Sequence, residues 1–129
     1  MLTMEQELIE LTRKLLSTIA ARDWESYAQL CDPSITCFEP EARGHLVAGL
    51  EFHRFYFELG GTRTPKQNTL VSPHVRILGN DAGVVSYVRL VQVVDANGSP
   101  QTVQCEESRV WEKRDGRWRH VHFHRSNNA

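Results

Sequence analysis

The sequence predicts an α+β domain in which a long N-terminal helix packs in a curved antiparallel sheet. Helical periodicity is confined to the first half of the 129 residues, and long segments of alternating apolar residues follow it. Helices that precede a run of strands are typical of α+β folds rather than of parallel α/β folds. Strands bent by bulges around one helix form a cone, whose open end is a natural pocket.

Composition and length predict one globular domain spanning residues 1–129, because a chain this long buries roughly two-thirds of its unfolded surface. Its 15 Lys and Arg residues nearly balance 16 Asp and Glu residues, so we expect no nucleic acid and no membrane as a partner. The first residues lack the basic and apolar regions of a signal peptide. Cys31, Cys37 and Cys105 lack metal-type spacing and are expected to be reduced thiols in a cytoplasmic protein.

The first half of the chain is expected to begin with two helices. Leu8, Leu11 and Leu15 lie on one stripe of a helix over residues 5–21. Asp23 is placed to cap a shorter helix that reaches Leu30. The remaining elements of this half are expected at residues 34–38 and 46–47 as short strands, 39–44 as a turn, and 50–59 as a helix closed by Gly60 and Gly61.

Long extended segments fill the second half and predict an antiparallel meander. Pro73 indicates a bulge or an edge position in the first of these segments, because proline cannot donate to a strand ladder. A turn cluster of Asp, Asn, Gly, Ser and Pro occupies residues 95–100. The four strands are expected at residues 68–78, 82–94, 101–113 and 117–126.

The turn at Asp115-Gly116 decides which residues of the last two strands share a face. A two-residue loop would place Arg109 and Arg125 on opposite faces. A three-residue loop with Gly116 in the left-handed conformation brings them together, and we predict this register. It places on one face Glu107, Arg109, Trp111, Arg119, Val121, Phe123 and Arg125. The other face then carries Val110, Glu112, Trp118, His120, His122 and His124.

Three arginines are expected to point into the cone from three strands. Arg89 alternates with Tyr87 and valines, as Arg109 and Arg125 alternate with apolar residues on theirs. Converging guanidinium groups in a cavity favour a carboxylate or phosphate ligand. The alternative is a buried structural network in which the same charges are paired internally. Spacing alone favours that network, with Glu107 and Glu39 as the partners of the arginines.

The histidines raise the question of a metal site. His120, His122 and His124 have the alternation that can place three imidazoles on one strand face. No carboxylate or cysteine partner is evident, so a polar or interface surface is the preferred interpretation, and we assign no metal and no cofactor. His53 is expected to face the sheet from its helix as a hydrogen-bonded core histidine.

The helix around His53 carries more aromatic side chains than one core can cover. Phe52, Phe55, Tyr56 and Phe57 surround it, so some apolar surface should contact another subunit.

Several motifs together resemble one family. They include Cys31-Asp32-Pro33, Phe38-Glu39-Pro40-Glu41-Ala42, Gly44-His45-Leu46-Val47, Phe52-His53-Arg54-Phe55-Tyr56-Phe57-Glu58, Pro73-His74-Val75, Tyr87-Val88-Arg89-Leu90, Glu106-Glu107-Ser108-Arg109-Val110-Trp111 and Val121-His122-Phe123-His124-Arg125-Ser126. The chain resembles, over nearly its whole length, the association or hub domain of calcium/calmodulin-dependent protein kinase II. That family has the cone-shaped nuclear transport factor 2-like fold.

The resemblance implies a non-catalytic oligomerisation module whose subunits pair and close into a ring of about a dozen or more copies. It also implies a pocket able to bind small carboxylates, lined by His53, Arg89, Arg109 and Arg125. Glu39, Tyr87 and Glu107 would support that pocket. The 129 residues contain no Gly-rich phosphate loop, no H-R-D catalytic segment and no basic calmodulin-binding helix, so no kinase activity is expected.

A second function remains open because the same fold supports small-molecule isomerases, cyclases and dehydratases. In the steroid-isomerase branch a carboxylate before proline is the base, a position that Glu39 resembles here. We expect nearby arginines to keep Glu39 ionised and to make it a poor base.

Overall fold

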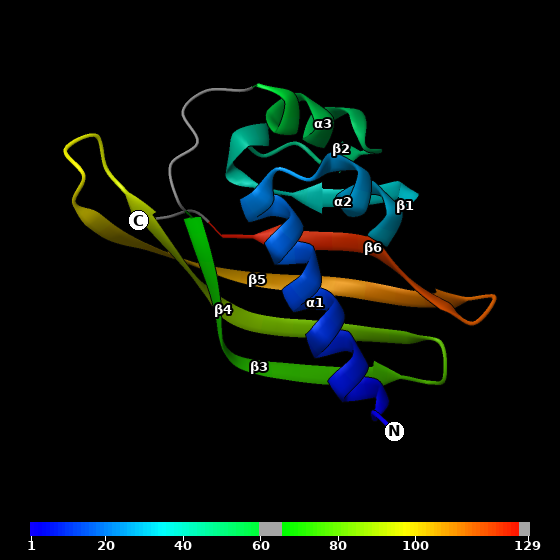
Figure 1. Cartoon of the computed structure of the whole chain (residues 1–129). Helices are drawn as coiled ribbons and strands as arrows, with labels where there is room; N and C mark the ends of the chain where they lie inside the picture. The colour runs from blue at the N-terminus through cyan, green and yellow to red at the C-terminus, as the bar shows by residue number, and fades with distance from the viewer. Residues whose placement is uncertain (60–65, 127–129) are drawn as a thin grey trace.

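The computed structural model describes residues 1–59 and 66–126 (Figure 1). Its elements are α1 (Met4–Ala21), α2 (Trp24–Leu30), β1 (Cys31–Phe38), a 3-10 helix (Pro40–Ala42), β2 (Val47–Ala48), α3 (Glu51–Glu58), β3 (Lys66–Leu78), β4 (Ala82–Val94), β5 (Pro100–Arg114) and β6 (Arg117–Arg125). The described strands form one sheet in the order β2-β1-β6-β5-β4-β3. Helix α1 crosses one face of the long strands (Figure 1), which confirms the predicted α+β fold class. The helix end expected at Gly60 and Gly61 lies outside the described residues.

The two N-terminal helices begin at side-chain caps. Thr3 Oγ1 accepts from the Gln6 backbone N–H at 3.1 Å, and the Gln6 side chain accepts from the Thr3 N–H at 2.8 Å. This reciprocal pair satisfies two donors that a helix start leaves without partners. Asp23 caps α2 as predicted, because its Oδ1 accepts from the Ser26 N–H at 3.2 Å.

Helix α1 packs directly on the sheet at Gly83. A Cβ added there would lie 2.4 Å from Leu8 Cδ1, so a larger residue would force the Leu8 side chain or the helix to shift. Leu8 and Trp111 are both fully buried in the core. The Trp111 indole N–H donates to Thr12 Oγ1 at 3.2 Å, so the buried tryptophan has a polar partner on the helix.

The sheet is antiparallel except at one pair of strands. β1 pairs with β6 in parallel, whereas the sequence predicted only antiparallel neighbours. β3 is an edge strand, and its pairing with β4 shifts register between Val71 and His74, around Pro73. The predicted bulge and edge position of Pro73 are therefore both confirmed.

The predicted three-residue loop between β5 and β6 is wrong. Arg114 pairs with Arg117, so Asp115 and Gly116 form a two-residue loop, and both have positive φ, 53° and 73°. A type I′ turn requires this conformation at both positions, and its twist matches that of the strands. The register shifts further along β6, where Trp111 pairs with His120 but Val110 pairs with His122.

This bulge at residue 121, rather than the turn, places the arginines together. Beyond it Arg109 pairs with Phe123 and Glu107 pairs with Arg125, so all four share the concave face. Before it the faces are reversed relative to the prediction. His120 and Trp118 are buried on the inner side, and Arg119 pairs with Glu112 on the outer side.

Among the described residues, no helix is both long and apolar enough to span a membrane.

All three cysteines are buried and free.

Candidate functional site

A cavity of about 420 Å³ opens beside the ends of α1 and α3, over the concave face of the sheet. Polar and charged side chains converge on it from α3, β4, β5, β6 and the segment after β1. The ionisable residues among its lining include Glu39, Glu41, His53, Arg89, Arg109 and Arg125. The structure therefore brings together all four residues that were predicted to line a pocket, with two carboxylates among them.

Glu107 lies beneath the cavity and joins two of the arginines. Its side chain is fully buried, and it accepts from Arg89 Nη1 at 2.8 Å, from Arg109 Nη2 at 3.1 Å and from the Tyr87 hydroxyl at 2.5 Å. Burial opposes the charge, but Arg109 and Arg89 outweigh it and lower the pKa of Glu107 to about 2. Glu107 is therefore an anion fixed by the fold.

Arg109 is the most buried cation of the network, with 1% of its side chain exposed. Its Nε donates to the Tyr87 hydroxyl at 2.8 Å, and its guanidinium lies 4.4 Å from the centroid of the Phe123 ring. Burial opposes its charge, but Glu107 keeps the pKa of Arg109 above its ordinary value. Its contacts on several sides identify Arg109 as a structural cation of this buried network.

Arg89 and Arg125 occupy more accessible positions on the cavity wall. Arg89 Nε donates to Asn68 Oδ1 at 2.7 Å, and Asn68 Nδ2 donates to the Leu16 carbonyl at 3.0 Å, which ties the network to α1. Arg125 Nη2 contacts Glu41 Oε1 and lies 3.5 Å from Glu39 Oε2. Each of the three arginines thus already has a glutamate partner.

The pKa values of the two glutamates beside Arg125 are shifted in opposite directions. Burial and the neighbouring Glu41 raise the pKa of Glu39 above its ordinary value, although Arg125 acts in the opposite direction. Burial also opposes the charge on Glu41, but its hydrogen bond with Arg125 lowers its pKa. Burial therefore influences the pKa of Glu39 more than Arg125 does.

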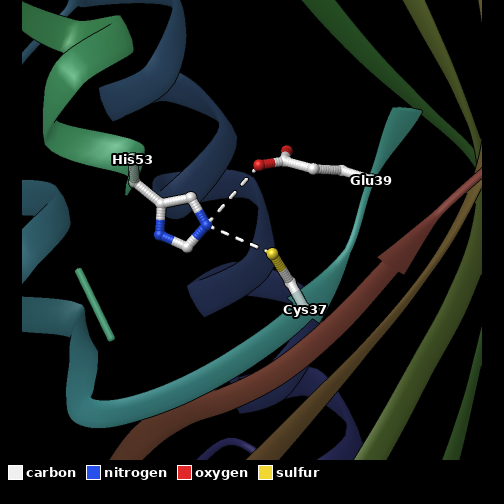
Figure 2. A group of neighbouring side chains, drawn as sticks. All are labelled: Cys37, Glu39 and His53. Carbon is white, nitrogen blue, oxygen red and sulfur yellow. Dashed lines mark hydrogen bonds and ion pairs between the residues drawn. The ribbon is translucent and has the colours of Figure 1, made fainter. Parts of the chain in front are cut away.

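His53 is buried on α3 and faces β1 rather than the arginines. Its Nε2 lies 3.3 Å from Cys37 Sγ and 3.7 Å from Glu39 Oε1 (Figure 2). Burial, with Arg109 adding to it, lowers the pKa of His53 to about 4, so the ring is neutral at physiological pH. The prediction of a hydrogen-bonded core histidine is confirmed only for the Cys37 contact, since Nδ1 has no partner among the described residues.

Sequence reasoning missed His120 and Glu41. His120 is fully buried, with Nδ1 at 3.5 Å from Cys31 Sγ and Nε2 at 3.5 Å from Arg109 Nη1. The sequence placed the bulge at the turn instead of at residue 121, and His120 was therefore assigned to the outer face. The predicted ladder of three histidines on one face is wrong, because His120 lies on the inner face and His122 and His124 lie on the outer face. The Pro-Glu-Ala sequence around Glu41 was a usable signal, because a short helical turn there returns its side chain toward the strand end.

The fold and the cavity first define a class, the nuclear transport factor 2-like domains. A protein described as NTF2-like from Cytophaga hutchinsonii shares the fold over 97% of this chain and 98% of its own, with a TM-score of 0.79 at 20% identity. At that identity the likeness concerns the fold alone.

Closer matches identify the family. The model of the calcium/calmodulin dependent protein kinase II association domain matches residues 4–129, and the chain belongs to this family. The hub homology domain of Chlamydomonas reinhardtii CaMKII is 53% identical with a TM-score of 0.90, covering 95% of this chain and 97% of its own. The association domain of C. elegans CaMKII is 50% identical with a TM-score of 0.90, covering 95% and 94%.

One relative is a much longer protein than this chain. The delta subunit of calcium/calmodulin-dependent protein kinase type II from Oryctolagus cuniculus is 49% identical over 124 residues, which are 95% of this chain but 23% of that protein. The chain thus corresponds to the association domain of such a kinase subunit. An association domain is an oligomerisation module, and the resemblance inferred from the motifs is confirmed.

Proposed function

We propose that copies of this chain pair and close into a ring of about a dozen or more subunits, without catalytic activity. Apolar side chains exposed at one end of the domain carry this proposal. Phe55 and Leu59 on and after α3 are each 59% exposed, and Tyr56 is 40% exposed. Leu46, before β2, is 53% exposed. Monomeric proteins rarely leave this many large apolar side chains on neighbouring elements in water.

Light scattering coupled to gel filtration tests the assembly. We expect a mass near twelve or more times the chain mass of 14.8 kDa at micromolar concentration. Phe55→Ser should shift the mass toward smaller species, because it removes an exposed aromatic side chain while leaving the core intact. Arg54→Ser is the matched control, since this neighbour is exposed and its contacts with Glu58 and with the Trp24 ring, 5.9 Å away, lie within one subunit. A wild-type monomer would overturn the proposal.

We further propose that the cavity binds a small carboxylate, with Arg125 as the guanidinium that accepts it. Arg89 and Arg109 are committed to buried Glu107, whereas Arg125 pairs with the two glutamates at the cavity wall. An incoming carboxylate can replace Glu39 at Arg125 if Glu39 takes up a proton, and the raised pKa of Glu39 favours that exchange. Binding should therefore strengthen as pH falls toward the pKa of Glu39.

A thermal-shift panel of small carboxylates tests the pocket. We expect a ligand that raises the wild-type midpoint and has little effect on Arg125→Gln. Arg119→Gln is the control, because Arg119 lies on the outer face opposite Glu112. Equal responses in wild type and Arg125→Gln, or no response to any acid, would count against a carboxylate pocket.

The second function considered from the sequence is an isomerase, cyclase or dehydratase that uses Glu39 as its base. The geometry around Glu39 offers little support for it. The two oxygens of Glu39 already face His53 and Arg125. Screening isomerase and dehydratase substrates with Glu39→Gln as the control would revive this alternative if turnover appeared in wild type and vanished in the variant.

A further inference from the structure

Cys37, Glu39 and His53 form a compact cluster beside the arginine cavity (Figure 2). We propose that this cluster is a zinc site, in which Cys37 Sγ, Glu39 Oε1 and His53 Nε2 each supply one ligand atom. All three residues belong to the preferred ligand types of zinc. The proposal does not rest on ring assembly or on carboxylate binding, although zinc would hold as an anion the Glu39 that the carboxylate exchange needs in its protonated form.

The spacing of the three atoms suits tetrahedral coordination. They lie within 4.8 Å of one another, with His53 Nε2 at 3.3 Å from Cys37 Sγ and 3.7 Å from Glu39 Oε1. Zinc bonds of about 2.0–2.3 Å at tetrahedral angles hold ligand atoms about 3.4–3.6 Å apart. Both separations from His53 are within a few tenths of an ångström of those values, so only Cys37 Sγ and Glu39 Oε1, up to 4.8 Å apart, would have to draw closer around a metal.

The backbone fixes the ligands from two separate elements. Cys37 lies at the end of β1, and Glu39 follows in extended conformation, with φ −149° and ψ 155°. Residues two apart in extended backbone point to the same side. His53 approaches from the opposite direction, from α3 (Figure 2). A metal here would connect α3 to β1.

The hydrogen bonding of His53 is the second observation that points to a ligand. Only 5% of its side chain is exposed, and Nδ1 has no partner among the described residues. Its contact with Glu39 at 3.7 Å is longer than a hydrogen bond, and the thiol of Cys37 is a weak partner. Nε2 is thus a buried nitrogen with only weak partners, and an ion bound to it is one accepted explanation, whereas Nδ1 would stay without a partner among the described residues.

The charges around the cluster can accommodate a dication. Cys37 would bind as a thiolate after its proton passes to solvent, so thiolate and Glu39 carboxylate together balance the two positive charges of zinc. Glu39 can bind zinc through Oε1 while Oε2 remains 3.5 Å from Arg125. Arg125 also keeps Glu41 as a partner. Because Glu39 and His53 both line the cavity, a water can complete the coordination from that side.

The ligand types also select the metal. A thiolate with an imidazole favours zinc over magnesium or calcium, which prefer all-oxygen sites. Cys31 Sγ and His120 Nδ1 form a second buried Cys-His contact, at 3.5 Å, but this pair belongs to no such group of three ligands among the described residues. Within residues 1–59 and 66–126, the cluster at Cys37 is the one group of three His, Cys, Asp or Glu side chains close enough to share an ion.

Cobalt(II), which replaces zinc at such sites and absorbs light, tests the proposal on the purified full chain after chelator treatment. We expect one cobalt per chain, a thiolate-to-cobalt charge-transfer band in the near ultraviolet, and loss of the band when one equivalent of zinc is added. Cys37→Ser should abolish the band, whereas Cys31→Ser and Cys105→Ser should retain it. Absence of the band in wild type, or its persistence in Cys37→Ser, would overturn the proposal.

A zinc competition assay with a chromophoric chelator tests the other two ligands. His53→Gln and Glu39→Gln should each weaken zinc binding by more than about 100-fold, since even indirect partners of metal ligands contribute 10–100-fold. His122→Asn and His124→Gln should leave the affinity unchanged, because these histidines lie on the opposite face. If the surface variants lose zinc and His53→Gln keeps it, the site is elsewhere. Near-ultraviolet circular dichroism of each variant verifies that it is folded.

Discussion

Replacing Glu107 by glutamine removes one buried negative charge from between two arginines. Arg109 would keep its positive charge with 1% of its side chain exposed, and Arg89 with 11%. The network lowers the pKa of Glu107 from 4.5 to about 2, which corresponds to roughly 3 kcal/mol at about 1.4 kcal/mol per pKa unit. Removing one partner of a buried ion pair costs about 3–5 kcal/mol in other proteins. We therefore expect Glu107→Gln to lower the free energy of unfolding by about 3 kcal/mol.

Urea unfolding at one fixed protein concentration measures the effect, because assembly makes stability depend on concentration. Glu106→Gln is the matched control, since Glu106 is exposed on the opposite face of β5 and should change stability by less than about 0.5 kcal/mol. The pKa of Glu107 is lowered in the folded state, so its contribution is complete above pH 4.5 and fades as pH falls toward about 2. Equal urea midpoints for the two variants at neutral pH would refute a stabilising role of the network.

Three further substitutions test the packing that positions the site. Gly83→Val should destabilise the protein by about 1–3 kcal/mol in urea unfolding, because its Cβ would lie 2.4 Å from Leu8 Cδ1; a neutral result would show that α1 can move away. Thr12→Val should cost about 1–3 kcal/mol, since the buried Trp111 indole N–H loses its acceptor, and unchanged tryptophan fluorescence with unchanged stability would contradict that contact. Asp23→Ala should cost about 1 kcal/mol through loss of the α2 cap, measured by thermal unfolding, whereas Asp23→Asn should cost little.

The helices and long strands could be predicted from the sequence because their signals are local. The stripe of Leu8 and Leu15, the cap at Asp23 and the proline at position 73 each act within a few residues of themselves. The parallel pairing of β1 with β6 joins segments about 85 residues apart, and no local pattern encodes it.

The sequence predicted which residues line the cavity, but it did not predict how the strands bring them together. Arg109 and Arg125 do share a face, yet the reason is a bulge at residue 121 and not the turn, and an alternating sequence looks the same on either side of a bulge. His120 was consequently assigned to the wrong face. The pairing of Arg125 with Glu41 and the closeness of Cys37 to His53 depend on how the segment after β1 and helix α3 meet, which spacing along the chain does not specify.

A closed ring built from paired copies is the assembly that we propose for this chain. Native mass spectrometry of the purified protein counts subunits directly and separates discrete rings from open chains. We expect one or two discrete assemblies with even subunit numbers of about a dozen or more, unchanged over a tenfold range of protein concentration. A monomer, an odd-numbered assembly, or a ladder of masses that grows with concentration would contradict it.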